Sequence, residues 1–198
     1  MWDTRYGADG YAYGAEPNDH LVQQVDQIPS GRVLCLAEGE GRNAVFLAKR
    51  GYDVTAVDQS AIGLDKAQGL ATASGVTIST RQADLANFEI EPGAWQGIVS
   101  IWAHVPPAIR VPLHRKVVAG LAPGGVFVLE AYTERQLEMP GRGGPPAAQR
   151  ELLMSLTSLE QELEGLDFVI GREIDRTVEE GEFHSGPSAV VQILARKQ

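Results

Sequence analysis

The residues best suited to ligand chemistry form a glycine-rich turn early in the chain. The run Gly39-Glu40-Gly41-Arg42-Asn43-Ala44 matches the pattern G-x-G-x-x-A and lies between an apolar segment and a helical one. In that setting the first glycine permits a tight turn, the second lets a ligand approach the backbone, and the alanine lets the helix pack close to the strand. Asp58 lies nineteen residues after Gly39. This spacing is typical of a loop that binds adenosine, with the acid on the ribose hydroxyls; a plain connecting turn is the alternative.

Two acids in this turn indicate the kind of adenosine ligand. Glu38 and Glu40 flank Gly39, where a dinucleotide would place its pyrophosphate against the positive end of the helix dipole. Carboxylates at that place repel phosphate and attract a cation, such as the ammonium and sulfonium groups of S-adenosylmethionine. None of the five tyrosines is followed four residues later by lysine, as a short-chain dehydrogenase would require. The turn therefore favours S-adenosylmethionine over NAD(P).

Polar residues also follow the later predicted strands. Asp84 and Leu85 come after the third strand, where the acid can accept a hydrogen bond from the adenine amino group while the leucine packs on the ring. A turn-capping role for the acid is equally open. His104 follows the fourth strand, and its ordinary pKa near 6.5 suits a general base. A histidine that bonds nearby backbone at the start of a helix is the alternative.

Further candidates lie beyond the fifth predicted strand. Glu130 and Tyr132 leave it toward the same crevice, because parallel strands end at one edge of the sheet, and both are candidate catalytic residues. Arg135 is a candidate for holding an anionic substrate. His184 lies in a polar stretch between the last two strands and is expected in solvent. The other histidines are expected on helix surfaces: His20 and His114.

The segments that must position these residues alternate between strand and helix patterns. Apolar runs predict strands at 32–36, 52–57, 76–82, 98–102, 126–131, 168–178 and 188–196. Capping residues and helical periodicity predict helices at 19–28, 42–50, 60–74, 106–121 and 151–163. Short connections between alternating strands and helices imply a parallel, doubly wound α/β sheet. The last two strands have no helix between them and must be antiparallel.

The length of 198 residues suits a single domain. Its expected parts are an N-terminal lid and helix segment (1–30), a cofactor-binding core (31–131), a substrate-side insertion and helix (132–165), and a C-terminal antiparallel hairpin (166–198). Within the insertion, 133–148 contains several prolines and glycines and no periodicity, which is typical of a functional loop.

The composition argues against some classes of binding partner and favours one cellular compartment. A net charge of −9 with no basic run argues against binding to nucleic acid or to an anionic membrane surface. No apolar run approaches the ~20 residues that cross a bilayer, and the first fifteen residues do not resemble a signal peptide. The single cysteine fits a reducing compartment. We expect a cytoplasmic protein, monomeric or homodimeric, with a small-molecule substrate and no metal site.

Four stretches carry a resemblance to a known family: WDTRYGADGYAYGAEPNDHL, GEGRNAVFLAKRGYDVTAVDQS, APGGVFVLEAYT and GPSAVVQILARK. Through them the chain resembles class I S-adenosylmethionine-dependent methyltransferases. The nearest branch acts on small molecules and includes the tellurite-resistance and thiopurine methyltransferase-like proteins. The resemblance implies a Rossmann-like sheet of seven strands in the order 3-2-1-4-5-7-6, with six parallel strands and the last antiparallel.

The resemblance also implies which residues hold the cofactor. It assigns them to the strand ends: Gly39 and Gly41 around the methionine part, Asp58 with Gln59 at the ribose, Asp84 and Leu85 at the adenine, and Ser100 at the end of the fourth strand. Two positions depart from the family, which usually carries an acid in place of Cys35 and a glycine in place of Ala37. Glu38 is the candidate that takes over the missing acid's contact with the cofactor's ammonium.

The activity implied is methyl transfer to a thiol, a chalcogen oxyanion or a small amine. A soft anionic acceptor needs no base, whereas an oxygen or amine acceptor does. The aromatic N-terminus is expected to fold over the site as a lid, with Tyr13 toward the substrate. A protein that binds the cofactor without catalysis, or an NAD(P)-dependent oxidoreductase, are the alternatives.

Overall fold

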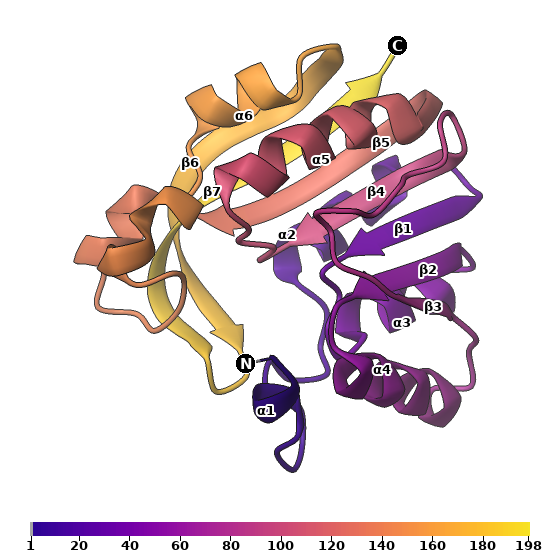
Figure 1. The fold of residues 1–198 in the computed structure, drawn as a ribbon, viewed down its shortest axis with the longest axis horizontal. Coiled ribbons are helices and arrows are strands. Elements are labelled where there is room, and N and C mark those ends of the chain that lie inside the picture. The colour runs from indigo at the N-terminus through magenta and orange to yellow at the C-terminus, as the bar shows by residue number, and fades with distance from the viewer. Residues whose placement is uncertain (1) are drawn as a thin grey trace.

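A single seven-stranded sheet organises the computed structural model, which describes residues 2–198 (Figure 1). The strands are β1 (Arg32–Leu36), β2 (Asp53–Asp58), β3 (Ser79–Gln82), β4 (Trp95–Ile101), β5 (Leu121–Tyr132), β6 (Leu166–Glu180) and β7 (His184–Lys197). Their order is β3-β2-β1-β4-β5-β7-β6, and β7 runs antiparallel to both of its neighbours. The predicted fold class and strand order are confirmed.

Helices cover both faces of the sheet. They are α1 (Trp2–Tyr6), α2 (Asp19–Gln24), α3 (Arg42–Lys49), α4 (Ala61–Ala73), α5 (Pro107–Gly120) and α6 (Leu156–Glu162), with short 3-10 turns η1 (Val25–Gln27), η2 (Glu134–Glu138) and η3 (Ala147–Leu152). Alternate residues of β1 point to opposite faces. Leu34 therefore packs in the cluster that includes α5 and α6, while Val33 packs in the cluster that includes α2, α3 and α4.

Side-chain caps fix where several helices begin. The Asn18 side chain accepts a hydrogen bond from the Leu21 amide and starts α2, and Ser60 does the same for α4 through the Gly63 amide. Both starts were expected from the cap preference of these residue types. The histidines expected on helix surfaces, His20 and His114, are instead buried.

The predicted helix at 151–163 is wrong at its beginning. Ser155 forms a capping box with Ser158, so α6 starts only at Leu156. Just before it, the Met154 amide donates to the Tyr132 carbonyl, which holds this stretch extended beside the end of β5. The leucine stripe has helical spacing throughout, but the serine cap and this tertiary bond divide it.

Several strand ends also differ from the expectation. β5 begins at Leu121 and runs through the Pro-Gly-Gly stretch, where its register against β4 is irregular. β6 and β7 are longer than predicted, so only 181–183 connects them. Much of the polar stretch expected between the two strands is therefore paired, and its tip reaches the N-terminal segment, where the Glu182 amide donates to the Ala12 carbonyl (Figure 1). The structure contains no helix within 2–198 with the length and apolar character of a membrane span.

Gly41 has a packing role rather than the expected role of admitting a ligand. Its φ is +89°, and a Cβ added there would lie 2.5 Å from the Cβ of Ala67 on α4. The glycine therefore lets the first turn of α3 approach α4. It does not line the cavity described below.

Replacing Gly41 by alanine should therefore destabilise the fold more than a comparable change elsewhere. We expect Gly41→Ala to lower the free energy of unfolding by about 2–5 kcal/mol, from backbone strain and overpacking together. Gly75→Ala is the matched control, because Gly75 also has positive φ but has no neighbour within 4 Å; its cost should be about 1–2 kcal/mol. Equal losses in urea denaturation would contradict the packing role.

Candidate functional site

A cavity of about 710 Å³ opens where β1 to β4 end. This volume is within the range of small-molecule sites. Each of these strands contributes residues at or just beyond its carboxyl end, on either side of the point where the strand order reverses between β1 and β4. The N-terminal segment covers it, with lining residues Trp2, Arg5, Tyr6, Tyr13 and Gly14.

Glu38 occupies the position that a pyrophosphate would need. Its Oε1 accepts a hydrogen bond of 2.7 Å from the Ala44 amide, in the first turn of α3. The free amides of a helix N-terminus are what bind a phosphate group. Because the protein's own carboxylate already bonds this turn and its charge faces the cavity, a dinucleotide phosphate is excluded from the loop by occupancy as well as by repulsion.

Burial makes Glu38 unusually basic for a carboxylate. It raises the pKa of Glu38 to about 7, against the opposing effects of the Ala44 amide and of the Arg42 guanidinium. Burial, and then the proximity of Glu38, raise the pKa of the Cys35 thiol. The carboxylate on residue 38 thus lies beside the thiol of residue 35, where the resembling family carries its acid. Ala37 between them has φ +51°, a left-handed conformation that favours the glycine usual at that position.

Glu40 does not act on a ligand in the way the sequence suggested. Its Oε1 pairs with Lys66 Nζ at 3.0 Å, and its Oε2 accepts a bond of 2.7 Å from the Ala12 amide. The charge is therefore compensated, and the side chain holds the N-terminal segment. The expectation that Glu40 repels phosphate is corrected, and the electrostatic argument rests on Glu38.

Asp58 lines the cavity with acceptor capacity left over. One oxygen accepts from the Gly39 amide at 2.9 Å and the other from the Ser60 amide at 2.8 Å. A carboxylate oxygen can accept a second bond, so both oxygens can still bind hydroxyl groups. Burial raises the pKa of Asp58, although these backbone bonds oppose the shift. Gln59 lines the cavity beside it.

The adenine candidates also lie at the cavity. Asp84 and Leu85 both line it, beyond the end of β3. Asp84 Oδ1 accepts a bond of 2.9 Å from the Ala86 amide, so the turn-capping role is present as well. Ser100, by contrast, is buried within β4 and does not line the cavity, which its neighbours Ile101–Val105 do.

His104 lines the cavity but has no free nitrogen. Its Nε2 accepts a bond of 3.2 Å from the Tyr132 amide, so the proton lies on Nδ1, which donates to the Leu152 carbonyl at 3.0 Å. Burial lowers the pKa of His104 to about 4 and keeps the ring neutral. The general-base prediction is therefore wrong for this structure, and the backbone-bonded alternative is the one observed.

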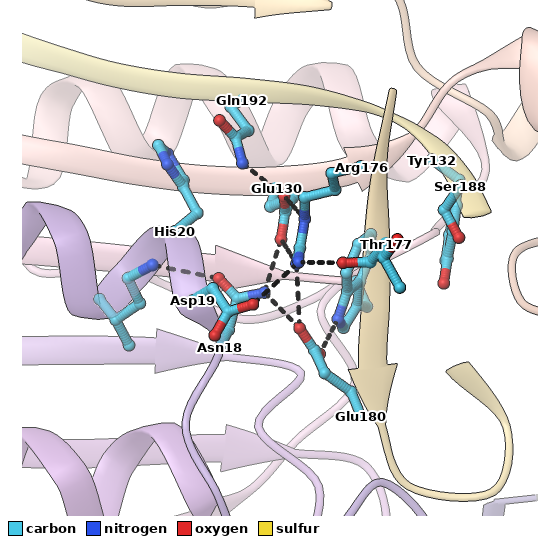
Figure 2. A network of polar contacts seen from close by, with 12 residues as sticks. Asn18, Asp19, His20, Glu130, Tyr132, Arg176, Thr177, Glu180, Ser188 and Gln192 are labelled. Carbon is cyan, nitrogen blue, oxygen red and sulfur yellow. Dashed lines mark hydrogen bonds and ion pairs between the residues drawn. The ribbon is translucent and has the colours of Figure 1, made fainter. Parts of the chain in front are cut away.

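Glu130 belongs to a buried polar network and not to the cavity (Figure 2). Its carboxylate accepts two bonds from Arg176, at 2.8 and 2.7 Å, one from Gln192 at 2.7 Å, and one from the Asn18 amide group. Four donors saturate the four acceptor sites of a carboxylate. The predicted catalytic role of Glu130 is wrong, because no lone pair is left and no ligand can reach it.

Glu180 extends this network to the cavity wall. It accepts from Asn18 at 2.8 Å and from Arg176 at 3.1 Å, and it pairs with Arg42. It also accepts from Trp102 Nε1, which fixes the indole at the cavity although Trp102 has φ +58°. Burial acts to raise the pKa of Glu180, but Arg42, the Trp102 bond and Arg176 hold it below its ordinary value.

Two further predicted residues lie outside the cavity. Arg135 pairs with Asp175 on the surface and does not line this cavity. Tyr132 is buried behind Trp102, with ring centroids 4.4 Å apart, and does not line the cavity. Tyr13 does line it, with its hydroxyl accepting a bond of 2.6 Å from Arg5.

His184 is the cavity residue that sequence reasoning missed. It was expected in solvent, yet only 8% of it is exposed, and it lines the cavity. The register of the hairpin makes it the first residue of β7, paired with Glu180. No local pattern marks it, because only the tertiary position of the hairpin brings it inward. Gly144–Pro146, in the loop expected to be functional, also line the cavity.

Comparison with known proteins agrees with this geometry. Residues 33–125 match a family described as a methyltransferase domain. The matched segment runs from β1 into β5 and so includes the strand ends that open on the cavity. The fold of the chain is similar to that of TehB from Haemophilus influenzae, with a TM-score of 0.75 and 19% identity over 100% of this chain and 66% of that one. It is also similar to the N-methyltransferase NodS from Bradyrhizobium japonicum, with a TM-score of 0.68 and 14% identity over 90% and 92% of the two chains.

One curated relative is a 2-heptyl-1-hydroxyquinolin-4(1H)-one methyltransferase from Mycobacteroides abscessus. It is 24% identical over 141 residues, which cover 69% of this chain and 62% of the relative. The chain thus matches less than two thirds of that relative's length. Among residues 2–198, no group of three or more His, Cys, Asp or Glu could hold a metal ion.

The buried network should contribute more to stability than surface ion pairs do. We expect Glu130→Ala to lower the free energy of unfolding by about 3–5 kcal/mol, because Arg176, Asn18 and Gln192 would each lose a bond inside the buried network. Arg135→Ala breaks an exposed pair and should cost about 0–1 kcal/mol. Chemical denaturation of both variants measures the difference; a small loss for Glu130→Ala would show that water replaces the missing carboxylate.

Proposed function

We propose that this chain transfers a methyl group from S-adenosylmethionine to a small-molecule acceptor. The observation that carries the proposal is the half-buried Glu38 carboxylate, which bonds the first turn of α3 and faces the cavity. A loop built in this way accepts a cationic adenosine ligand and rejects a pyrophosphate. The methyltransferase-domain match and the fold of the structural neighbours support the same proposal.

The cavity residues fit the parts of this cofactor. Glu38, Asp58 and Asp84 line one end of the cavity, and none has an ion-pair partner within residues 2–198. Glu38 would hold the ammonium, Asp58 the ribose hydroxyls, and Asp84 the adenine amino group, with Leu85 on the ring. Arg5 has no carboxylate partner in the same range and complements the cofactor's carboxylate. When bound, the cofactor supplies an electrophilic methyl group on sulfur.

The chain's own contribution is to orient the acceptor and to exclude water. The N-terminal segment covers the cavity and carries Tyr13. Two of the predicted acid–base groups are committed elsewhere, since His104 bonds backbone through both nitrogens and Glu130 is saturated. This arrangement favours acceptors that react without a protein base, such as a thiol or a chalcogen oxyanion, over a small amine.

We also propose the setting in which the domain acts. The net charge of −9 favours free small molecules over nucleic acid as substrates. We propose a cytoplasmic monomer or homodimer that works as one domain, with 1–30 as lid, 31–131 as cofactor core, 132–165 on the acceptor side and 166–198 as hairpin. The relative from Mycobacteroides abscessus is named for a hydroxyquinolone substrate, which makes planar heteroaromatic molecules candidate acceptors as well.

Binding of S-adenosylhomocysteine tests the proposal directly. We expect calorimetry to detect it and to detect no binding of NADH. Asp58→Ala should weaken the affinity by about 1.5–3 kcal/mol, roughly ten- to hundredfold, because hydrogen bonds to a charged group are lost. Asp53→Ala, at the opposite end of β2, is the control and should bind normally. Binding of NADH instead would favour an oxidoreductase, and binding without turnover on any acceptor would leave a cofactor-binding protein.

The raised pKa of Glu38 predicts how cofactor affinity depends on pH. Its pKa is about 7, so Glu38 is charged above that pH and neutral below it. A ligand ammonium binds the charged form, so affinity should fall as pH drops through 7, approaching about tenfold per unit. Arg42 and Asp58 are the charged groups that act on it with opposite signs.

Glu38→Gln separates this effect from other titrations. The variant should bind S-adenosylhomocysteine more weakly at pH 8 and should lose most of the pH dependence. Calorimetry of the wild type at pH 6 in two buffers of different ionisation enthalpy should also show proton release on binding. A wild-type affinity that does not change between pH 6 and pH 8 would contradict the assignment of Glu38 to the ammonium.

A further inference from the structure

The half of the cavity away from the glycine loop is mainly aromatic and apolar. Its wall includes Trp102, Tyr13, Leu152, Pro145 and Pro146. Aromatic and apolar walls bind a flat apolar body well, and a few polar groups then fix its orientation. A side chain that orients such a ligand must have a polar atom without a hydrogen-bond partner in the protein.

Most of the polar side chains here already have partners. Arg42, at the start of α3, pairs with Glu180 beside Trp102, and the Tyr13 hydroxyl accepts from Arg5. His104 uses both ring nitrogens on backbone groups. These groups are committed to holding the cavity walls together, whereas Gln149 is exposed to solvent.

His184 is different, because its ring makes no hydrogen bond to any described residue in 2–198. Its Nδ1 is enclosed and has no partner, its Nε2 has no partner either and is the nitrogen that is not enclosed, and the whole residue is only 8% exposed and lines the cavity. A buried polar group without a partner is destabilising, so such groups are rare and call for an explanation. The ring is held among aromatic neighbours, with centroids 4.7 Å from Tyr13, 5.1 Å from Trp102 and 5.3 Å from Tyr132.

We propose that the His184 imidazole binds the methyl acceptor, a planar aromatic molecule with a hydroxyl or thiol group, by accepting that group's hydrogen. This inference rests on the proposed function, because it takes the bound molecule to be the methyl acceptor. The hydrogen bond to His184 itself requires only binding and no turnover. Burial, with Arg42 and His104, lowers the pKa of His184 to about 3, against Glu180. The ring is therefore neutral near pH 7 and has a lone pair to offer. His184 is therefore assigned to binding the acceptor and not to removing its proton.

The contact has a consequence for the product. Methyl transfer replaces this hydrogen, which leaves as a proton to solvent while the cofactor leaves as S-adenosylhomocysteine, so the methylated product has no hydrogen to donate. The product then loses this bond and leaves the imidazole unpaired again. Such a site binds the acceptor more tightly than its methylated form, because binding the methylated form leaves the imidazole nitrogen without a hydrogen-bond partner.

Binding of a model compound tests the inference without turnover. Naphthol and its methyl ether are titrated into the wild type, alone and with saturating S-adenosylhomocysteine, and followed by calorimetry and tryptophan fluorescence. We expect naphthol to bind about three- to tenfold more tightly than the ether, as one net hydrogen bond allows. His184→Phe keeps a ring in place and should bring this ratio close to one. His184→Gln restores an acceptor and should recover part of it.

The control is His20→Phe, which removes another buried imidazole that does not line the cavity; its ratio should equal that of the wild type. Equal wild-type affinities for naphthol and its ether, or no binding of either, would overturn the inference. So would an unchanged ratio in His184→Phe or, if that variant does not fold, a ratio near one in His184→Gln. If S-adenosylhomocysteine does not bind while the His184-dependent ratio persists, the proposed function fails and the binding site stands.

Discussion

The pairing of Glu130 with Arg176 is the interaction on which the rest of the site depends. A buried carboxylate and a buried guanidinium are tolerated only when every acceptor and donor has a partner. Meeting that requirement ties the start of α2, through Asn18, to the ends of β5, β6 and β7. The hairpin is thereby held in one register beside the cavity, and that register is what turns His184 inward.

The same requirement reaches the cavity wall through Glu180. Because Glu180 bonds both Arg42 and Trp102, the network fixes a cation at the start of α3 and an indole at the end of β4. Trp102 has a left-handed backbone, and such strain persists only where the surroundings hold it. A set of buried charges thus provides a rigid support for groups that face the ligand.

Much of the fold follows from local patterns, while much of the site does not. Alternating strand and helix segments predict a parallel, doubly wound sheet that ends in an antiparallel pair, and the resemblance to a known family implies the strand order. The spacing from Gly39 to Asp58 predicts two groups that the structure joins by a hydrogen bond of 2.9 Å. Glu130 and His104 were misjudged because a strand-end acid or histidine looks the same in sequence whether its partners are ligand or protein. Their partners lie far along the chain, as Arg176 does from Glu130. His184 was missed for the converse reason, because a polar stretch gives no sign that tertiary packing will bury it.

The N-terminal segment crosses the cavity at a residue with an unusual pair of bonds. The Ala12 amide donates to Glu40, beside the glycine loop, and the Ala12 carbonyl accepts from the Glu182 amide at the hairpin tip. The N-terminal segment is therefore hydrogen-bonded both to the glycine-loop side of the cavity and to the hairpin side. Glu40, beside the glycine loop, and the tip of the β6–β7 hairpin are thus linked through a single residue of the N-terminal segment.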